Sequence, residues 1–227
     1  MKNIIITWVS SWLWYSLSKL FLNKWFNVIW LSRTKSDLDL NHFKVDFTNE
    51  ISIKNCSEKI IFEYDWKIDC IINCAAIWYI EDLNDVDFEK TREVFSVNLW
   101  GQNYFLSQLS DLIKKSWTDI VFIWATIWYK ANGFMPIYSM SKWGLRWMIE
   151  NWRAFLSKTK NRVIWIHPGW LDTQSNIWPE WRETLISEIT WKPVWSLIST
   201  DEISKLVYTF INLPKNIEIS EVIINRK

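Results

Sequence analysis

Short runs of apolar residues recur along this chain, and most are followed by a longer stretch in which apolar residues return every three or four positions. The short runs predict strands at 3–7, 27–31, 42–46, 68–73, 119–124, 162–166 and 218–224. The longer stretches predict helices near 12–24, 50–63, 87–115, 137–158, 178–189 and 200–212. Strands that are apolar throughout are buried on both faces. Their alternation with helices therefore predicts an α/β fold, a doubly wound parallel sheet of about seven strands flanked by helices.

Length and charge narrow this picture. The chain has 227 residues, which suits a single domain over 1–227, and no stretch has the composition of a linker. Its 26 basic and 25 acidic residues leave a net charge of +1, which argues against disorder and against nucleic-acid binding. The start has three consecutive aliphatic residues, too few for a signal peptide or a membrane span, so a cytoplasmic location is expected. Three cysteines and two histidines are too scattered to predict a disulfide or a metal site.

Glycine and tryptophan are the anomaly in the composition. The chain has four glycines, where average usage of about 7% predicts roughly 16, and it has 20 tryptophans. In a doubly wound sheet, ligands bind beyond the carboxyl ends of the strands. Residues 7–14, after the first predicted strand, read Thr-Trp-Val-Ser-Ser-Trp-Leu-Trp. Three indoles there would block the backbone N–H groups that a phosphate needs to reach.

With glycine at positions 8, 12 and 14, the same segment reads T-G-V-S-S-G-L-G. It then resembles the T-G-x-x-x-G-x-G cofactor loop of the short-chain dehydrogenase/reductase family, whose single-domain members have a Rossmann-like fold. The resemblance implies a cofactor contact for Thr7, Trp8, Ser10, Ser11, Trp12 and Leu13.

Other tryptophans also occupy positions that favour glycine. Trp25 follows the first predicted helix, where the left-handed conformation is common, and Trp66 and Trp117 lie in turns before predicted strands. We hypothesise that most of the tryptophans are glycines in the native protein, through a UGA codon that is read here as tryptophan. Trp143 is an exception, because it matches an aromatic residue common in the family. The alternative is that all 20 are genuine and form an unusually aromatic core or binding surface.

A second motif, Tyr138-x-x-x-Lys142, opens the predicted helix after the fifth strand. Residues four apart share a helix face, so the ammonium should lie near the phenol and lower its pKa from about 10, which favours proton transfer to or from a carbonyl. Elsewhere the same spacing is common on helix surfaces. Its place after the fifth strand matches the catalytic motif of the family, which implies that role for Tyr138 and Lys142.

The resemblance implies two further catalytic residues. Asn98, in Val-Asn-Leu-Trp-Gly, matches a family asparagine that positions a water near the lysine. The family serine that orients the substrate carbonyl stands 13 positions before the tyrosine, and here that position is Ala125. Thr126 is adjacent and is the candidate substitute, although an alanine at that position also fits weak or absent catalysis.

Further landmarks concern the cofactor. Asn73 and Ala75, in Asn-Cys-Ala-Ala, resemble the N-N-A-G element that lies along it. Asp46 and Phe47, after the third strand, resemble the adenine-binding position, although a lone Asp is also typical of a turn or a helix N-cap. Arg33, after the second strand, favours NADP because a guanidinium pairs with the 2′-phosphate, although it also fits a solvated surface charge. A loop after the sixth strand resembles P-G-x-x-x-T, which otherwise reads as a plain turn. The resemblance implies a cofactor contact for four residues of this loop, Pro168, Gly169, Leu171 and Thr173.

Together these features predict an NADP-dependent oxidoreductase, with NAD as the alternative cofactor, that reduces a small carbonyl compound or oxidises the alcohol. Residues 174–199 are the predicted substrate segment, and the resemblance implies a homodimer or homotetramer through the helices near 87–115 and 137–158. Two other interpretations stay open. One is a dinucleotide-binding sensor or scaffold with little or no catalysis, and the other is a non-enzymatic interaction protein if the tryptophans are genuine.

Overall fold

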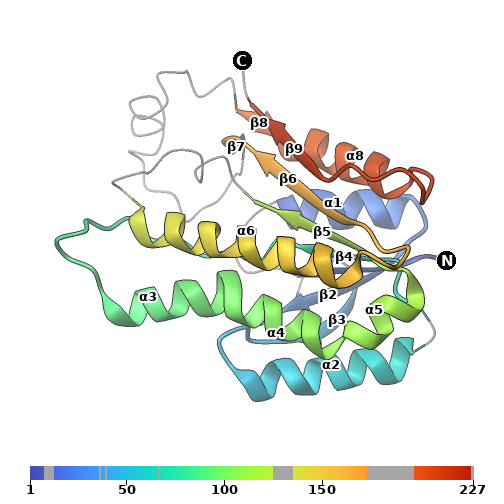
Figure 1. The fold of residues 1–227 in the computed structure, drawn as a ribbon, viewed down its shortest axis with the longest axis horizontal. Coiled ribbons are helices and arrows are strands. Elements are labelled where there is room, and N and C mark those ends of the chain that lie inside the picture. Colours follow the sequence, from blue (N-terminus) through green and yellow to red (C-terminus); the bar gives the residue numbers. More distant parts are fainter. Residues whose placement is uncertain are drawn as a thin grey trace.

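The computed structural model describes residues 1–7, 13–35, 37–38, 40–65, 67–124, 135–172 and 197–225. Seven parallel strands form one sheet in the order β3-β2-β1-β4-β5-β6-β9 (Figure 1). They are β1 (Asn3–Thr7), β2 (Asn27–Ser32), β3 (Asn41–Lys44), β4 (Cys70–Asn73), β5 (Asp119–Ile123), β6 (Val163–Pro168) and β9 (Glu221–Ile224). A separate two-stranded ladder joins β7 (Leu171–Asp172) and β8 (Ile198–Ser199). The doubly wound parallel sheet predicted from the sequence is confirmed.

Helices connect the strands. The described ones are α1 (Leu13–Asn23), α2 (Glu50–Tyr64), α3 (Phe88–Phe95), the π-helix η1 (Ser96–Trp100), α4 (Gly101–Gln108), α5 (Ser110–Ser116), α6 (Pro136–Leu156) and α8 (Thr200–Ile211). The single helix predicted near 87–115 is wrong in detail, because η1 widens it and Leu109 (φ −96°, ψ 4°) breaks it. The helix predicted near 178–189 lies outside the described residues. None of the described helices is long and apolar enough to cross a membrane.

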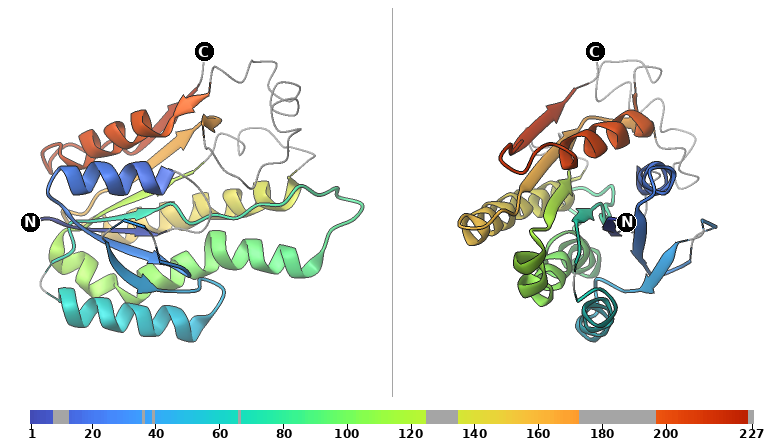
Figure 2. Two further views of the ribbon diagram at one scale, coloured as in Figure 1. Left: turned by 180° about the vertical axis from the view of Figure 1, so that it is seen from behind. Right: turned by 90° about the vertical axis from the view of Figure 1, so that its right-hand side faces the viewer.

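The sheet is covered on both faces, as Figure 2 shows. Ile5 and Ile71 point to the face covered by α2, α4 and α6, whereas Ile4, Ile6 and Ile72 point to the face covered by α1 and α8. All five are fully buried. Burying one such side chain contributes about 1.5–3 kcal/mol, so the alternating isoleucines stabilise both layers of the core.

The strand order places the switch point of the sheet between β1 and β4. Thr7 pairs with Asn73 in the parallel register at the carboxyl ends of these strands. From there the chain leaves β1 towards β2 on one side and β4 towards β5 on the other. Ligands of doubly wound folds bind at such a reversal, so the topology assigns the candidate site to this edge.

At the opposite end of the strands, a buried ion pair of Asp119 and Arg162 is joined by the more exposed Lys215. Asp119 at the start of β5 accepts two hydrogen bonds from Arg162, of 3.0 and 2.6 Å, and Lys215 Nζ lies 2.6 Å from its Oδ1. Arg162 also donates to the carbonyl oxygens of Ile211 and Ile217. The guanidinium therefore attaches the segment after α8 to the sheet.

Two tryptophans have the conformation that favours glycine. Among the described residues other than glycine, only Trp25 (φ 61°) and Trp117 (φ 55°) have a positive φ. Each follows a helix, and the next residue closes a six-residue turn: Phe26 N donates to Phe21 O at 3.0 Å, and Thr118 N donates to Ile113 O at 3.2 Å. These are Schellman motifs, whose left-handed position is usually glycine. The left-handed conformation expected at Trp25 and the turn expected at Trp117 are confirmed, and the identity of the native residue stays a prediction.

Other tryptophans lie in the core. Trp30 and Trp165 are almost fully buried, and Trp30 stacks on Trp14 with 4.6 Å between ring centroids. Trp124 meets Trp165 edge-on at 5.0 Å. Such contacts between rings would be expected if all 20 tryptophans are genuine and form an aromatic core. Trp66 lies outside the described residues.

Candidate functional site

The site is built around the first turns of α6. This helix starts with Pro136, a residue suited to the first turn because it has no N–H to leave unpaired. Tyr138 and Lys142 follow one turn apart, and Lys142 Nζ lies 5.3 Å from the centroid of the Tyr138 ring. Lys142 is only 1% exposed. The predicted position of the two side chains on one helix face is therefore present.

Burial controls the ionisation of both groups. It raises the pKa of Tyr138 above its ordinary value. Burial also lowers the pKa of Lys142 to about 8, an effect that Cys74 opposes. The expected lowering of the Tyr138 pKa by Lys142 is not found, because the shift is upward and its cause is desolvation, which penalises the phenolate. At neutral pH Tyr138 carries its proton.

Asn98 lies in η1 and is fully buried. Its Oδ1 accepts from Ile77 N at 2.8 Å, and its Nδ2 donates to Ile77 O at 2.9 Å and to Ser141 Oγ at 2.9 Å. The amide is thus occupied by protein partners. Asn98 connects the segment after β4 with α6, and the role in positioning a water that the resemblance implied stays a prediction.

The backbone after β4 is held from three sides. Thr7 Oγ1 accepts from both Cys74 N and Ala75 N at 3.2 Å. Gln102 Nε2 donates to Ala75 O at 2.5 Å and to Val97 O at 3.1 Å. With Asn98 on Ile77, three elements distant in sequence fix residues 74–77. The sequence did not indicate Gln102, because its role depends on a contact with a segment 27 residues away.

Asn73, next to this segment, has a polar side chain without a partner. It is 2% exposed, and neither Oδ1 nor Nδ2 has a hydrogen-bond partner among the described residues. A buried polar group that lacks a partner costs about 1–3 kcal/mol. The Asn73 amide therefore fits a site that is completed by a polar ligand.

The predicted adenosine end lies after β2 and β3. Arg33 is exposed directly beyond β2. Asp46 Oδ1 accepts from Thr48 N at 2.9 Å and from Thr48 Oγ1 at 2.8 Å, so the turn role left open by the sequence is present. Phe47 is 4% exposed and has its ring in the core, edge-on to Phe105. A Cβ on Gly101 would lie 2.2 Å from Phe47 O, so this position requires glycine.

Other predicted residues have structural roles. Leu13 and Ala75 are buried in the core, on opposite faces of the sheet. Pro168 ends β6, Gly169 N donates to Ile224 O at 2.8 Å, and Leu171 belongs to β7. Six predicted site residues lie outside the described residues, with Ala125 and most of the predicted substrate segment. These six are Trp8, Ser10, Ser11, Trp12, Thr126 and Thr173.

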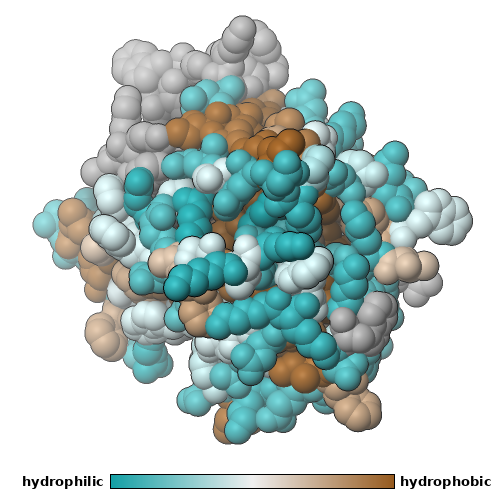
Figure 3. Space-filling view, turned by 45° about the vertical axis from the view of Figure 1, so that its right-hand side comes forward, coloured by the Kyte–Doolittle hydropathy of each residue, from teal (hydrophilic) through white to brown (hydrophobic). Residues whose placement is uncertain are grey.

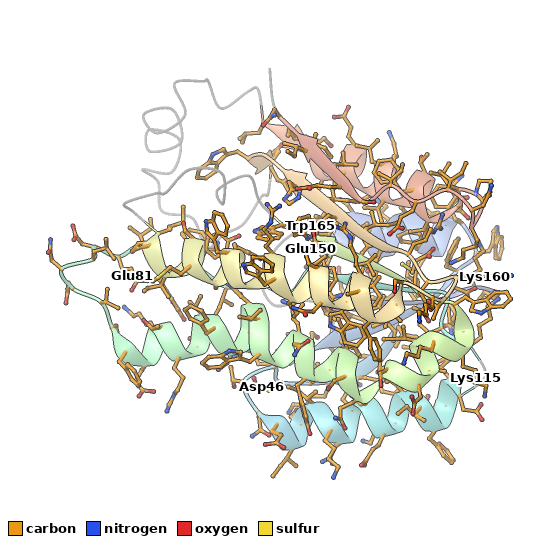
Figure 4. All side chains as sticks on the ribbon, viewed as in Figure 1. Asp46, Glu81, Lys115, Glu150, Lys160 and Trp165 are labelled. Atoms are coloured by element: carbon orange, nitrogen blue, oxygen red, sulfur yellow. The ribbon has the colours of Figure 1, made fainter. Side chains whose placement is uncertain are left out.

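A buried histidine lies near the end of β6. His167 is fully buried, and its Nε2 lies 2.9 Å from Oε1 of Glu221 on the edge strand β9. Burial lowers the pKa of His167 to about 4, helped by the positive charges of Arg146 and Arg153 on α6. Both guanidinium groups also lie over the ring of Trp165, which Figure 4 labels. The imidazole is therefore neutral at pH 7 and is part of the packing between α6 and the sheet.

Figure 4 shows Asp46 and Glu81 towards the end where the strands finish, and Lys115 and Lys160 at the opposite end. Figure 3 shows a mostly hydrophilic face with an apolar area near its top, at the level of α8 and β9. The described residues contain no cluster of three or more His, Cys, Asp or Glu side chains that could hold a metal ion.

Comparison with known proteins agrees with this geometry. The family model described as short chain dehydrogenase matches residues 9–183. An uncharacterized oxidoreductase of Thermotoga maritima is 30% identical over 148 residues, which is 64% of this chain and 55% of that protein. An uncharacterized oxidoreductase of Schizosaccharomyces pombe is 24% identical over 206 residues, 86% of this chain and 70% of that protein. A sepiapterin reductase of Chlorobaculum tepidum is 27% identical over 125 residues, 55% of this chain and 51% of that protein. The aligned part thus spans about half of two of these relatives.

Solved structures share the fold over nearly the whole chain. An alcohol dehydrogenase from the archaeon Thermococcus sibiricus, complexed with 5-hydroxy-NADP, has a TM-score of 0.81 at 17% identity and covers 99% of this chain and 96% of that one. ElxO with NADP bound has a TM-score of 0.82 at 18% identity and covers 98% of this chain and 97% of that one. At such identities the likeness concerns the fold.

Proposed function

This chain belongs to the short-chain dehydrogenase family, and on that premise we propose that it is an NADP-dependent oxidoreductase that reduces a small carbonyl compound or oxidises the corresponding alcohol. One observation carries the proposal. Tyr138 and Lys142 lie 5.3 Å apart, ammonium to ring, on the helix beside the β1–β4 switch point, where the buried amide of Asn73 lacks a partner. The proposal is supported by these two features, a tyrosine–lysine pair and one unpartnered amide at the carboxyl end of β4.

The residues that we assign to the cofactor end or follow the strands β1, β2, β3 and β4. We assign the pyrophosphate to the loop that begins at Thr7 and leads into α1, and the central part of the cofactor to Asn73 and Ala75. Arg33 is exposed beyond β2 and is the group for a 2′-phosphate, since guanidinium and phosphate form charge-assisted bonds. Asp46 is assigned to the adenine through Oδ2, because Oδ1 already accepts from Thr48. Two structural neighbours carry NADP or an analogue of it, which supports this choice.

Bound NADPH would supply the hydride. The protein supplies the proton: burial keeps Tyr138 protonated at neutral pH, so its Oη can donate to a carbonyl oxygen that gains charge. Lys142, with a pKa of about 8, can exchange a proton near neutrality and so reload the phenol. Asn98 contributes by fixing the Ile77 backbone and Ser141 through three hydrogen bonds.

The test combines binding and turnover. NADPH binding is measured by fluorescence, and NADPH oxidation is followed across a panel of aldehydes and ketones. Tyr138→Phe should bind NADPH like the wild type and lose turnover by at least ~100-fold, the usual contribution of a general acid. Unchanged turnover in that variant, or a wild-type protein that binds no dinucleotide, would refute the proposal.

The second candidate function is a cofactor-binding sensor or scaffold of the same fold. It is motivated by Ala125 at the position of the usual serine. If the protein has this function, it should bind NADPH, and no carbonyl compound in the panel should oxidise the bound NADPH. Ala125→Ser should not produce activity either. Turnover by the wild-type protein excludes it. Gene sequencing accompanies both tests, because a protein made with tryptophan at positions 8, 12 and 14 could have a blocked phosphate loop.

A further inference from the structure

Ser141 connects two helices next to the candidate catalytic pair. It lies on α6 between Tyr138 and Lys142 and is fully buried. Its hydroxyl accepts a hydrogen bond from Asn98 Nδ2 at 2.9 Å and donates one to Tyr138 O at 2.7 Å. One oxygen therefore joins the π-helix η1 to the backbone of the residue that carries the phenol.

The connection continues beyond Asn98. The same amide makes bonds of 2.8 and 2.9 Å to the N–H and C=O groups of Ile77. A series of hydrogen bonds, from Ile77 to Asn98 and from Asn98 to Ser141, thus connects the segment after β4 to the turn that carries Tyr138. Asn98 and Ser141 are both fully buried, so water is not available to replace a lost partner.

We propose that Ser141 is a positioning residue for the reaction. It holds the turn of α6 that carries Tyr138 and Lys142 in place relative to the backbone of residues 74–77, which follows β4 at the proposed cofactor site. This inference rests on the proposed function. The physical reason is that the Nδ2 of Asn98 has two acceptors, and only the Ser141 hydroxyl belongs to α6. Without it, an amide hydrogen remains unsatisfied in the interior, and η1 and α6 can relax apart.

The chain offers a matched control in Ser139. This serine also lies on α6, is 8% exposed, and donates to a carbonyl of its own helix, Met135 O, at 2.9 Å. It has no bond to Asn98. Ser139→Ala and Ser141→Ala therefore remove the same group from the same helix, and only Ser141→Ala breaks the connection to η1.

The experiment measures kcat, KM for NADPH and the pH profile of kcat for the wild type, Ser139→Ala, Ser141→Ala, Asn98→Ala and the double variant Asn98→Ala/Ser141→Ala. Ser141→Ala should lower kcat by about 10- to 100-fold, as small misplacements of reacting groups do. Its KM for NADPH should stay within about 2-fold of the wild-type value, because a positioning residue affects the chemical step, which kcat reports. The acidic and basic limbs of its pH profile should also move, because the surroundings of Tyr138 and Lys142 change. Ser139→Ala should keep the wild-type kcat and pH profile.

The double variant decides whether Ser141 acts through Asn98. In the Asn98→Ala background, Ser141→Ala should lower kcat by less than about 3-fold, because the connection is already broken. Equal kcat values for Ser139→Ala and Ser141→Ala, or an undiminished effect of Ser141→Ala in the Asn98→Ala background, overturn the proposal.

A stability measurement separates this proposal from the proposed function. If the wild-type protein has no turnover, the proposed function fails, and the same four variants are compared by urea unfolding. If Asn98 and Ser141 are coupled, the unfolding equilibrium constant of the double variant should differ by about 10-fold from the value expected when the effects of the two single substitutions are multiplied. Additive effects of the two substitutions would overturn the connection itself, independently of any activity.

Discussion

The left-handed tryptophans allow a test in which the sign of the effect is predicted. At Trp25 and Trp117, substitution by glycine and by alanine removes the same indole, so contacts of the ring cancel in the comparison. One of these contacts is Lys160 Nζ, 4.3 Å from the Trp117 ring. What remains is the backbone: at φ 61° and 55°, a Cβ costs about 1–2 kcal/mol that glycine avoids. Glycine should therefore be more stable than alanine at both positions, by about 1 kcal/mol once the greater freedom of unfolded glycine is included.

Trp143 is the matched control. It is half exposed within α6, where the backbone is helical. Alanine should be more stable than glycine there by about 1 kcal/mol, since glycine is a poor helix former. Urea unfolding measures all six variants, and in thermal melts each kcal/mol corresponds to a shift of about 2–4 °C for a chain of this size. If alanine equals or exceeds glycine at positions 25 and 117, the strain argument is wrong, and with it the structural support for glycine in the native protein.

Three further predictions concern charged groups. Arg33→Asp should weaken NADPH binding by about 10- to 100-fold, because a charge-assisted bond to the 2′-phosphate becomes a repulsion, while NADH binding changes little; equal losses for both cofactors would place the phosphate elsewhere. Arg162→Met should lower the free energy of unfolding by about 2 kcal/mol, because Asp119 loses two charge-assisted hydrogen bonds although Lys215 stays beside it; a loss below about 1 kcal/mol in urea unfolding contradicts this. The folded-state pKa of His167, about 4, lies below its unfolded value of 6.5, so the unfolded state binds more protons and this contribution to stability is lost as the pH falls from 6.5 to 4. The stability difference between the wild type and His167→Gln should accordingly change by about 3 kcal/mol between pH 7 and pH 4, and a constant difference would exclude the effect.

Local pattern was sufficient for the fold class. All seven strands of the main sheet were predicted, with ends shifted by up to three residues, such as 218–224 against Glu221–Ile224. A buried parallel strand is recognisable because both its faces are apolar, as in Asn3–Thr7, where every residue is buried. The positions of Tyr138 and Lys142 were likewise predictable, because a spacing of four residues on a helix fixes a shared face.

The surroundings of those side chains were not predictable. The helix expected over 87–115 is interrupted by η1, which lets Asn98 reach Ile77 on one side and Ser141 on the other. The role of Asn98 and that of Gln102 depend on partners 21 and 27 residues away. Neither contact leaves a local pattern in the sequence.

For this protein, the sequence by itself determined the periodicities, the α/β class and the residue types at the ends of the strands, because these depend on neighbours a few positions apart. Only the tertiary structure decided the pKa shifts of Tyr138 and Lys142, the hydrogen bonds that hold residues 74–77, and the lack of a partner for the Asn73 amide. Burial and hydrogen bonding are set by segments brought together from across the chain, and they change a pKa or complete a site only after folding.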